Sequence, residues 1–443
     1  MSAPGISKAF VLPAVQVSVL KNGLKVYAVP RHELPLISLH LILPFGAETD
    51  PPNRGGLCDL TAEMLTLGTH RRSATRLAAE VDGMGAILGA HSGWNATSIR
   101  LFGLSEDWAR LLDLLLEVTT QSAFSPEEFA QLKQRRMGAL FQQKDESQIQ
   151  ADERFEERLF FGTSYGHPVY GTLKSLPGLN AQDAQNFYRD HFLPPGSFVV
   201  LVGDLDADLC CRWLEDQFPM LEKPKEKRED SPFLPPKISS GIRTFIMDRP
   251  DLTQSQIRFG HAGIPHAHPD YLSFEVMNYV LGAGGFSSRL MQRIRSELGY
   301  TYGIRSSLEA RKYAGPFMIS TFTPTETTFS CIQEIFSVLR SFLDRGATEQ
   351  EREEALNFLI GSYPRKFETL SQIAQKIIQV ELHGLGLEEL SAYPQKISSI
   401  AREEIALAAR SHLHPEGMLG VIVGRSEAFR QKLEDLGPVE MIE

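Results

Sequence analysis

The feature of this sequence that most restricts its fold is a pattern of elements that occurs twice. Each copy contains an amphipathic helix, a second helix that starts with serine or threonine followed by acidic residues, and a later buried strand. The repeated elements are helices at 107–122 and 326–344, helix starts at 125–128 and 348–351, and strands at Phe198–Gly203 and Met418–Gly424. Each pair is separated by about 220 residues, which predicts two copies of one α/β domain. The alternative is a chain of two unrelated α/β domains.

A charged, proline-rich segment between the copies indicates where the two domains are joined. Residues 223–236 offer few apolar side chains that could be buried. We therefore predict an N-terminal domain at 1–222, a linker at 223–240 and a C-terminal domain at 241–443. In the first domain, Asn22-Gly23 between alternating apolar runs predicts a β-hairpin.

The composition excludes several classes of protein. The net charge is −10 and no long lysine or arginine run occurs, which argues against nucleic acid as a partner. No segment approaches the ~18–20 apolar residues of a membrane span. The four cysteines form no Cys-x-x-Cys pair, so we expect no disulfide framework and a reducing compartment. Residues 1–8 lack a secretion signal. We expect a soluble protein that is cytoplasmic, or periplasmic if a signal peptide has been removed.

Residues 281–302 combine a glycine-rich turn, a short amphipathic helix and the expected start of a strand. Arg295 and Tyr302 are seven residues apart across this helix-to-strand corner. Such a corner can direct a guanidinium and a phenol to one point, as a binding site for a carbonyl oxygen requires. The alternative is an ordinary turn, helix and strand with a surface arginine and a packed tyrosine.

This stretch resembles the arginine–tyrosine segment of the pitrilysin/insulinase superfamily of zinc peptidases, which includes mitochondrial processing peptidase and two-subunit bacterial relatives. The similarity lies in the lead-in at 284–290, the interval from Arg295 to Tyr302, and Gly299 between them. The resemblance implies that Arg295 and Tyr302 hold the substrate backbone opposite a zinc ion.

The glycine-rich loop has two interpretations. The resemblance places Gly284, Gly285 and Phe286 near bound substrate. Close packing at a tight turn is the alternative, because a lone glycine cluster without a Gly-Lys-Ser/Thr ending is not a phosphate loop. A second segment, 86–91, resembles the strand whose edge receives an extended peptide in the family, and an ordinary sheet strand is its alternative.

The family's zinc motif is present here only as a frame. In the family, His-x-x-Glu-His on a helix binds zinc and activates water. Residues 56–69 keep the Gly-Leu, Met-Leu and Gly-Thr positions of this frame. Asp59 and Glu63 occupy the two histidine positions, and Ala62 occupies the position of the glutamate. The third ligand would fall near 137–139, where no carboxylate stands. The resemblance therefore implies no metal in this chain and zinc in a partner chain.

Asp59 and Glu63 share one helix face because they are four residues apart. Two carboxylates without a histidine or third ligand make a poor zinc site. We expect them to be polar residues of a former active-site face, paired with an arginine such as Arg54. We interpret His266 and His268, in a loop with prolines, as a turn and helix entry, since one intervening residue suits no helix-face site.

The resemblance extends from about residue 15 to 425. It implies an α+β fold of two homologous α/β domains, each a mainly antiparallel sheet covered by helices, that form one half of a clamshell. It further implies the zinc-less subunit of a heterodimeric metallopeptidase, active on peptides only with a homologous zinc-bearing partner. The alternatives are a purely structural scaffold, like the core subunits of a respiratory complex, and a homodimer with an unconventional metal.

Overall fold

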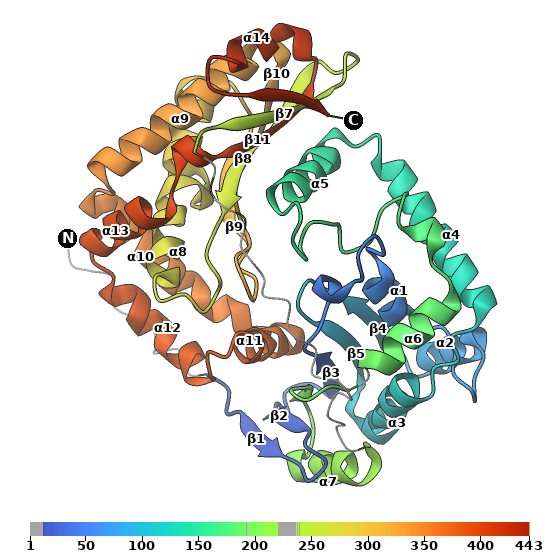
Figure 1. Cartoon of the computed structure of the whole chain (residues 1–443). Coiled ribbons are helices and arrows are strands. Elements are labelled where there is room, and N and C mark those ends of the chain that lie inside the picture. The colour runs from blue at the N-terminus through green and yellow to red at the C-terminus, as the bar shows by residue number, and fades with distance from the viewer. Residues whose placement is uncertain (1–11, 192, 220–235, 237, 239, 443) are drawn as a thin grey trace. The chain divides into compact units, whose positions relative to one another are not determined.

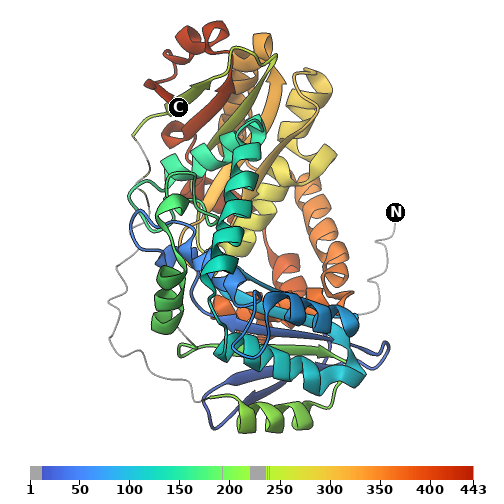
Figure 2. The ribbon, with the colours of Figure 1, turned by 90° about the vertical axis from the view of Figure 1, so that its right-hand side faces the viewer.

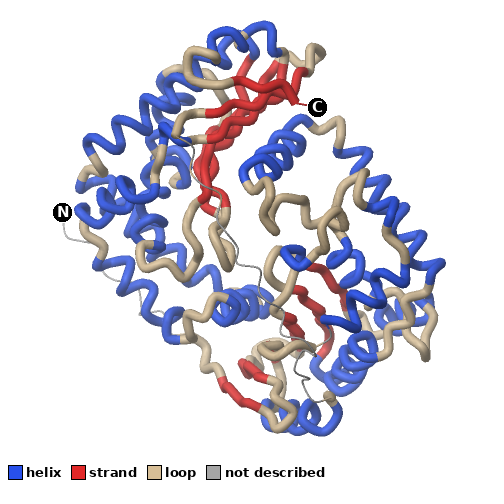
Figure 3. The backbone as a smooth tube through the Cα atoms, in the orientation of Figure 1, coloured by secondary structure: helices blue, strands red, loops and turns tan. Residues whose placement is uncertain are grey.

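Two six-stranded sheets organise the computed structural model, which describes residues 12–191, 193–219, 236, 238 and 240–442 (Figure 1). The chain divides into two compact units, and each unit contains one of the sheets. The predicted linker at 223–240 lies almost entirely outside the described residues. Figure 3 shows the strands of each sheet side by side in red, with helices in blue.

The sheet of the first unit has the strand order β1-β2-β6-β3-β5-β4. Its strands are β1 (Gln16–Val19), β2 (Lys25–Pro30), β3 (Leu36–Leu43), β4 (Ile87–Ser92), β5 (Thr97–Leu104) and β6 (Phe198–Gly203). β2 and β6 are parallel, and every other pair is antiparallel. The predicted hairpin joins β1 to β2, with Gly23 at a φ of 86° that suits glycine. All residues of β6 are buried, as its apolar sequence predicts.

The sheet of the second unit repeats this arrangement. Its strands are β7 (Arg243–Asp248), β8 (Gln254–Ala262), β9 (Ile304–Leu308), β10 (Pro316–Pro324), β11 (Leu419–Gly424) and β12 (Val439–Ile442). The order β7-β11-β8-β10-β9 matches β2-β6-β3-β5-β4, and β7 and β11 are parallel like β2 and β6. The sheets differ at one edge, where β12 is parallel to β7 but β1 is antiparallel to β2. The predicted repeat and α+β fold class are confirmed.

The helices also agree closely with the repeated pattern. They are α1 (Leu57–Met64), α2 (Ala74–Gly83), α3 (Trp108–Thr120), α4 (Pro126–Gln143), α5 (Ser147–Leu159), α6 (Ala181–His191), α7 (Ala207–Gln217), α8 (Tyr271–Asn278), α9 (Thr328–Arg345), α10 (Glu349–Ser362), α11 (Leu370–Leu382), α12 (Glu388–Ser399), α13 (Arg402–His412) and α14 (Arg430–Leu433). The expected helices at 107–122 and 326–344 are α3 and α9. The helix starts at 125–128 and 348–351 begin α4 and α10. None of the helices in the described part of the chain is long and apolar enough to span a membrane.

Each sheet packs against a helix that comes from the opposite half of the sequence (Figure 2). In the second unit, α5 lies on β8 and β11, and the Phe155 ring fills the space above Gly260. In the first unit, α11 lies on β3 and β6, and Lys25 Nζ donates to Glu381 Oε1 at 2.8 Å.

The compact units are therefore discontinuous in sequence. The first unit comprises 1–138, 169–231 and 362–393, and the second comprises 139–168, 232–361 and 394–443. These limits differ from a single division at the predicted linker, because α5 and α11 are grouped by packing and not by sequence position.

Candidate functional site

The helix that carries the degenerate zinc motif is fixed at its start by a glycine and an aspartate. Gly56 has a φ of 93°, and a Cβ atom there would lie 2.9 Å from the Gly171 backbone. The Asp50 carboxylate accepts the backbone N–H groups of Gly56 and Cys58 at 2.7 Å each. Burial raises the pKa of Asp50 to about 7, against the opposing effect of these two bonds. The glycine of the frame, Gly56, thus has a structural role that is independent of metal.

Asp59 and Glu63 project from α1 toward Arg136 on α4, and we call these three residues the Arg136 cluster. Arg136 Nη2 lies 2.7 Å from Asp59 Oδ2 and also contacts Glu63 Oε1. The other Asp59 oxygen accepts the Ser92 N–H at 3.2 Å. Asp59 is only 1% exposed, and burial raises the pKa of both carboxyl groups while the guanidinium opposes that shift.

The donor set of this cluster does not fit zinc. A structural or catalytic zinc site needs three or four nitrogen, sulfur or carboxylate ligands in tetrahedral directions. In the described part of the chain, no third histidine, cysteine or carboxylate joins Asp59 and Glu63 at ligand distance. The Arg136 guanidinium instead supplies the positive charge between them, and it lies 4.7 Å from the centre of the Tyr170 ring.

Arg54, which we expected to pair with Asp59 and Glu63, is not their partner. Arg54 forms an ion pair with Asp183 at 2.5 Å, whereas Arg136 pairs with Asp59 and Glu63. Arg54 is close to Asp59 in the sequence, but the fold brings Arg136 of α4 to both carboxylates of α1. The signal that could have identified Arg136 is its position one residue before 137–139, where the family's third ligand was expected.

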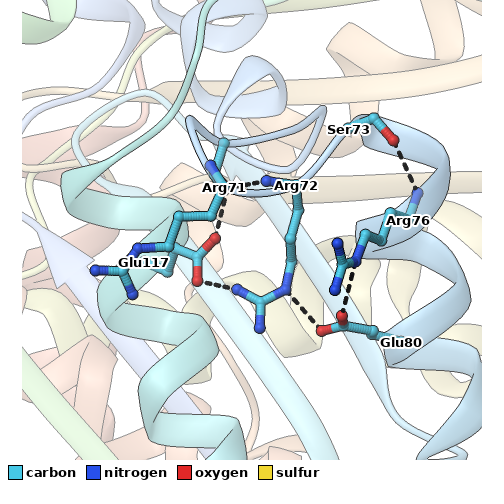
Figure 4. Close-up of polar contacts among 7 residues, drawn as sticks. Arg71, Arg72, Ser73, Arg76, Glu80 and Glu117 are labelled. Atoms are coloured by element: carbon cyan, nitrogen blue, oxygen red, sulfur yellow. Dashed lines mark hydrogen bonds and ion pairs between the residues drawn. The ribbon is translucent and has the colours of Figure 1, made fainter.

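The far end of the motif frame also has a structural role. Gly68 has a φ of 103°, and the Thr69 hydroxyl donates to the buried Glu117 carboxylate. Arg72 lies between two carboxylates, with an ion pair to Glu117 and another to Glu80 at 2.6 Å (Figure 4). Thr69 therefore ties the segment after α1 to α3, and Arg72 ties the same segment to α2 and α3.

The second candidate site follows α8, which continues as a π-helix at Tyr279–Ala283. The expected short amphipathic helix is a second π-helix, at Met291–Glu297, and β9 starts at Ile304, later than expected. π-Helical segments are rare in proteins, and those that occur often lie at functional sites.

Two of the three glycines at 282–285 are required by close packing. A Cβ atom on Gly282 would lie 2.4 Å from Ser306 Oγ, and one on Gly284 would lie 2.8 Å from the Tyr279 carbonyl oxygen. Gly285 has a φ of 60° and faces open space. Packing thus accounts for Gly282 and Gly284, while substrate contact by Gly284, Gly285 and Phe286 stays a prediction.

The three arginines of this stretch have different environments. Arg289 donates two hydrogen bonds to Glu351 at 2.6 and 2.7 Å. Arg293 pairs with Glu297 and Glu334. The Arg295 guanidinium lies 4.4 Å from the centre of the Phe286 ring and has no carboxylate partner among the residues that the structure describes. Arg295 is therefore the arginine of this stretch whose hydrogen-bonding capacity is available to a ligand.

Tyr302 is exposed, which differs from the alternative of a packed tyrosine. Tyr302 is 78% exposed and Phe286 is 66% exposed. The neighbouring backbone is held by threonines of β10, since Thr321 Oγ1 donates to the Gly303 carbonyl at 2.9 Å and Thr323 Oγ1 to the Tyr300 carbonyl at 2.6 Å. These threonines were missed in the sequence because hydroxyls in a strand carry no distinctive motif. Convergence of Arg295 and Tyr302 on one substrate stays a prediction.

The predicted peptide-binding strand at 86–91 corresponds to β4, which lies at the edge of its sheet beside β5. An edge strand presents unpaired backbone groups that an added strand can use. The repeat places β9 at the equivalent edge of the second sheet, next to the segment that carries Tyr302.

Two protein-family models match the chain. Residues 30–172 match the model described as "Insulinase (Peptidase family M16)", and residues 178–359 match "Peptidase M16 inactive domain". The matches together include the degenerate motif, Arg295 and Tyr302.

Individual proteins agree with these matches. The chain is 25% identical to the "Non-peptidase homolog YmxG" of Helicobacter pylori, over 89% of this chain and 90% of that protein. It is 26% identical to an "Uncharacterized zinc protease" of Rickettsia bellii, over 76% and 79% of the two chains. The crystal structure of a peptidase M16 inactive domain from Pseudomonas fluorescens superposes with a TM-score of 0.83 and 26% identity, over 93% of this chain and 98% of that one.

Proposed function

Because this chain belongs to the insulinase family of peptidases, family M16, and lacks its zinc motif, we propose that it is the zinc-less subunit of a two-chain peptidase. In this proposal, Arg295 and Tyr302 contact the peptide substrate. A homologous partner with an intact His-x-x-Glu-His motif would supply zinc and the glutamate that activates water.

The contrast between two arginines carries this proposal. Arg136 forms ion pairs with both Asp59 and Glu63, so the cation at the degenerate motif comes from a side chain of this chain. Arg295, in contrast, lies on the exposed Phe286 ring without a carboxylate partner in the described residues, close in sequence to the exposed Tyr302. An unpaired guanidinium and an exposed phenol are suitable donors for the carbonyl oxygens of a peptide backbone.

The roles of the two side chains follow from their chemistry. The Tyr302 hydroxyl donates a hydrogen bond to the oxyanion that develops on the carbonyl of the peptide bond being cleaved. The Arg295 guanidinium, which lies over the Phe286 ring, donates to a neighbouring backbone carbonyl and fixes the peptide in position. Both donors recognise backbone atoms, which implies little dependence on the substrate's side chains.

Co-expression tests the proposal. The chain is produced alone, together with a homologous chain that carries His-x-x-Glu-His, and that chain is also produced alone. We expect a stable complex of the two chains and cleavage of unfolded peptides only by that complex. Cleavage by the partner alone at the rate of the complex would show that Arg295 and Tyr302 are not needed, and would favour a scaffold role.

A further inference from the structure

A second group of potential metal ligands lies in the second unit, away from the Arg136 cluster. His268 and Asp270 precede α8, and His412 is the last residue of α13, a helix that packs against α8. One ligand atom from each of these three residues lies within 4.8 Å of the other two. We propose that His268, Asp270 and His412 form a binding site for one divalent transition-metal ion of the Zn²⁺ class.

The geometry requires only small side-chain movements. Asp270 Oδ2 lies 2.7 Å from His412 Nε2 and 3.9 Å from His268 Nδ1. Ligands about 2.1 Å from a tetrahedral ion are roughly 3.4 Å apart, which lies between these two distances. An ion at this position takes the place of the hydrogen bond between His412 Nε2 and Asp270 Oδ2, and His412 then binds as a neutral imidazole with its hydrogen on Nδ1. The ion also replaces the hydrogen bond that the Asp270 N–H donates to His268 Nδ1 at 3.1 Å.

The charges at this group distinguish it from the Arg136 cluster. Asp59 and Glu63 have a guanidinium between them. The ion pairs of Asp270 with described residues involve only the imidazoles of His268 and His412. An imidazole can lose its proton and bind a metal, whereas a guanidinium cannot. Two imidazole nitrogens and one carboxylate oxygen suit Zn²⁺ and its neighbours in the first transition row.

The surrounding structure holds the three ligands in place. The His268 N–H donates to the Pro265 carbonyl at 3.0 Å, and the Tyr271 N–H donates to the His268 carbonyl at 2.9 Å. The His412 ring packs edge-on against that of His268, with ring centres 5.0 Å apart. The three side chains are 14% to 42% exposed, so water can reach the ion and complete its coordination. The bound ion joins the start of α8 to the end of α13.

Zinc titration of the full chain, produced without a polyhistidine tag and stripped with EDTA, tests the site by calorimetry. We expect one Zn²⁺ per chain. His268→Gln and Asp270→Asn should weaken binding at least about tenfold, because even loss of an outer-shell partner costs 10- to 100-fold. His266→Gln is the matched control, since His266 stacks on Tyr271 outside the group and its variant should bind like the wild type.

Two further measurements separate the possible outcomes. Zn²⁺ should raise the melting temperature of the wild type and of His266→Gln, but not of His268→Gln. Co²⁺ in place of Zn²⁺ should give a visible absorption band that depends on His268. The proposal is overturned if the wild type shows no saturable binding, if His268→Gln binds as tightly as the wild type, or if binding is lost only in Asp59→Asn/Glu63→Gln.

Discussion

At the scale of single residues, the positive charge of Arg136 stabilises the buried carboxylate of Asp59. Removing one partner of a buried ion pair leaves an uncompensated charge, which is strongly destabilising. Arg136→Met should therefore lower the free energy of unfolding by about 3 kcal/mol, measured by urea denaturation. Arg54→Met removes an arginine from a more exposed pair with Asp183 and should cost less than about 1 kcal/mol.

A double variant checks the reason for that loss. Arg136→Met combined with Asp59→Asn removes the buried charge together with its partner, so part of the stability should return. If the double variant is less stable than Arg136→Met alone, Arg136 contributes through packing, for example on Tyr170, and not through charge.

Tyr302→Phe tests the proposed oxyanion contact separately from protein stability. Because Tyr302 is largely exposed, loss of its hydroxyl should not change the stability. Loss of one oxyanion donor typically costs ~10²–10³ in rate, so Tyr302→Phe should lower kcat of the two-chain complex by about that factor. Assembly, measured by size-exclusion chromatography, should not change. Tyr300→Phe, two residues earlier on the same segment, should keep the wild-type rate. A wild-type rate for Tyr302→Phe would exclude the proposed role.

At this scale, the sequence shows which residues stand at the motif positions, but it does not show which contacts those residues make. Asp59, Ala62 and Glu63 identify the degenerate motif directly, because a helix motif depends on neighbouring residues only. Their partner Arg136 is more than 70 residues away, and its position depends on how α4 packs against α1. Chemistry that is local in sequence can be predicted, and pairing across the fold cannot.

At the scale of elements, the glycine-rich segment after α8 is held against β9. A methyl group on Gly282 would lie 2.6 Å from the Ser306 backbone nitrogen, which cannot move without displacing the strand. Gly282→Ala should destabilise the protein by about 2 kcal/mol, as overpacking of a close contact does, and should lower the thermal midpoint.

Gly361→Ala is the matched control in the same unit. Gly361 lies within α10, and no atom of the described residues outside the adjacent helix backbone is within 4 Å of the position of an added methyl group. Alanine is the better helix former, so this variant should gain about 0.5–1 kcal/mol. Equal thermal midpoints for the two variants would contradict the packing explanation of Gly282.

At the scale of the whole molecule, the repetition of one α/β domain was predicted from the sequence, because apolar runs and helix starts recur at a constant interval. The grouping of α5 with the second sheet and α11 with the first was not accessible. Both helices are amphipathic, and nothing in an apolar face indicates which of two similar sheets it will cover. The packing shows it, since Phe155 of α5 fills the space above Gly260.

This exchange of helices makes a prediction about fragments. Residues 1–222 contain the whole first sheet but lack α11, whose buried residues are Ile373, Ala374, Ile377 and Val380. Each large apolar side chain contributes about 1.5–3 kcal/mol on burial, so the missing helix removes much of a typical domain's 5–15 kcal/mol stability. Produced alone, 1–222 should aggregate or unfold without a cooperative transition. Co-produced with 223–443, it should be recovered in a complex.

A cleavage site inserted near residue 228 of the full chain provides the control, because cutting there removes no helix from either unit. The two pieces should elute together after cleavage and keep the urea midpoint of the intact chain, since each unit contains segments from both pieces. If 1–222 alone unfolds cooperatively at that same midpoint, then α11 contributes nothing essential to the first unit, and the linker is a true domain boundary.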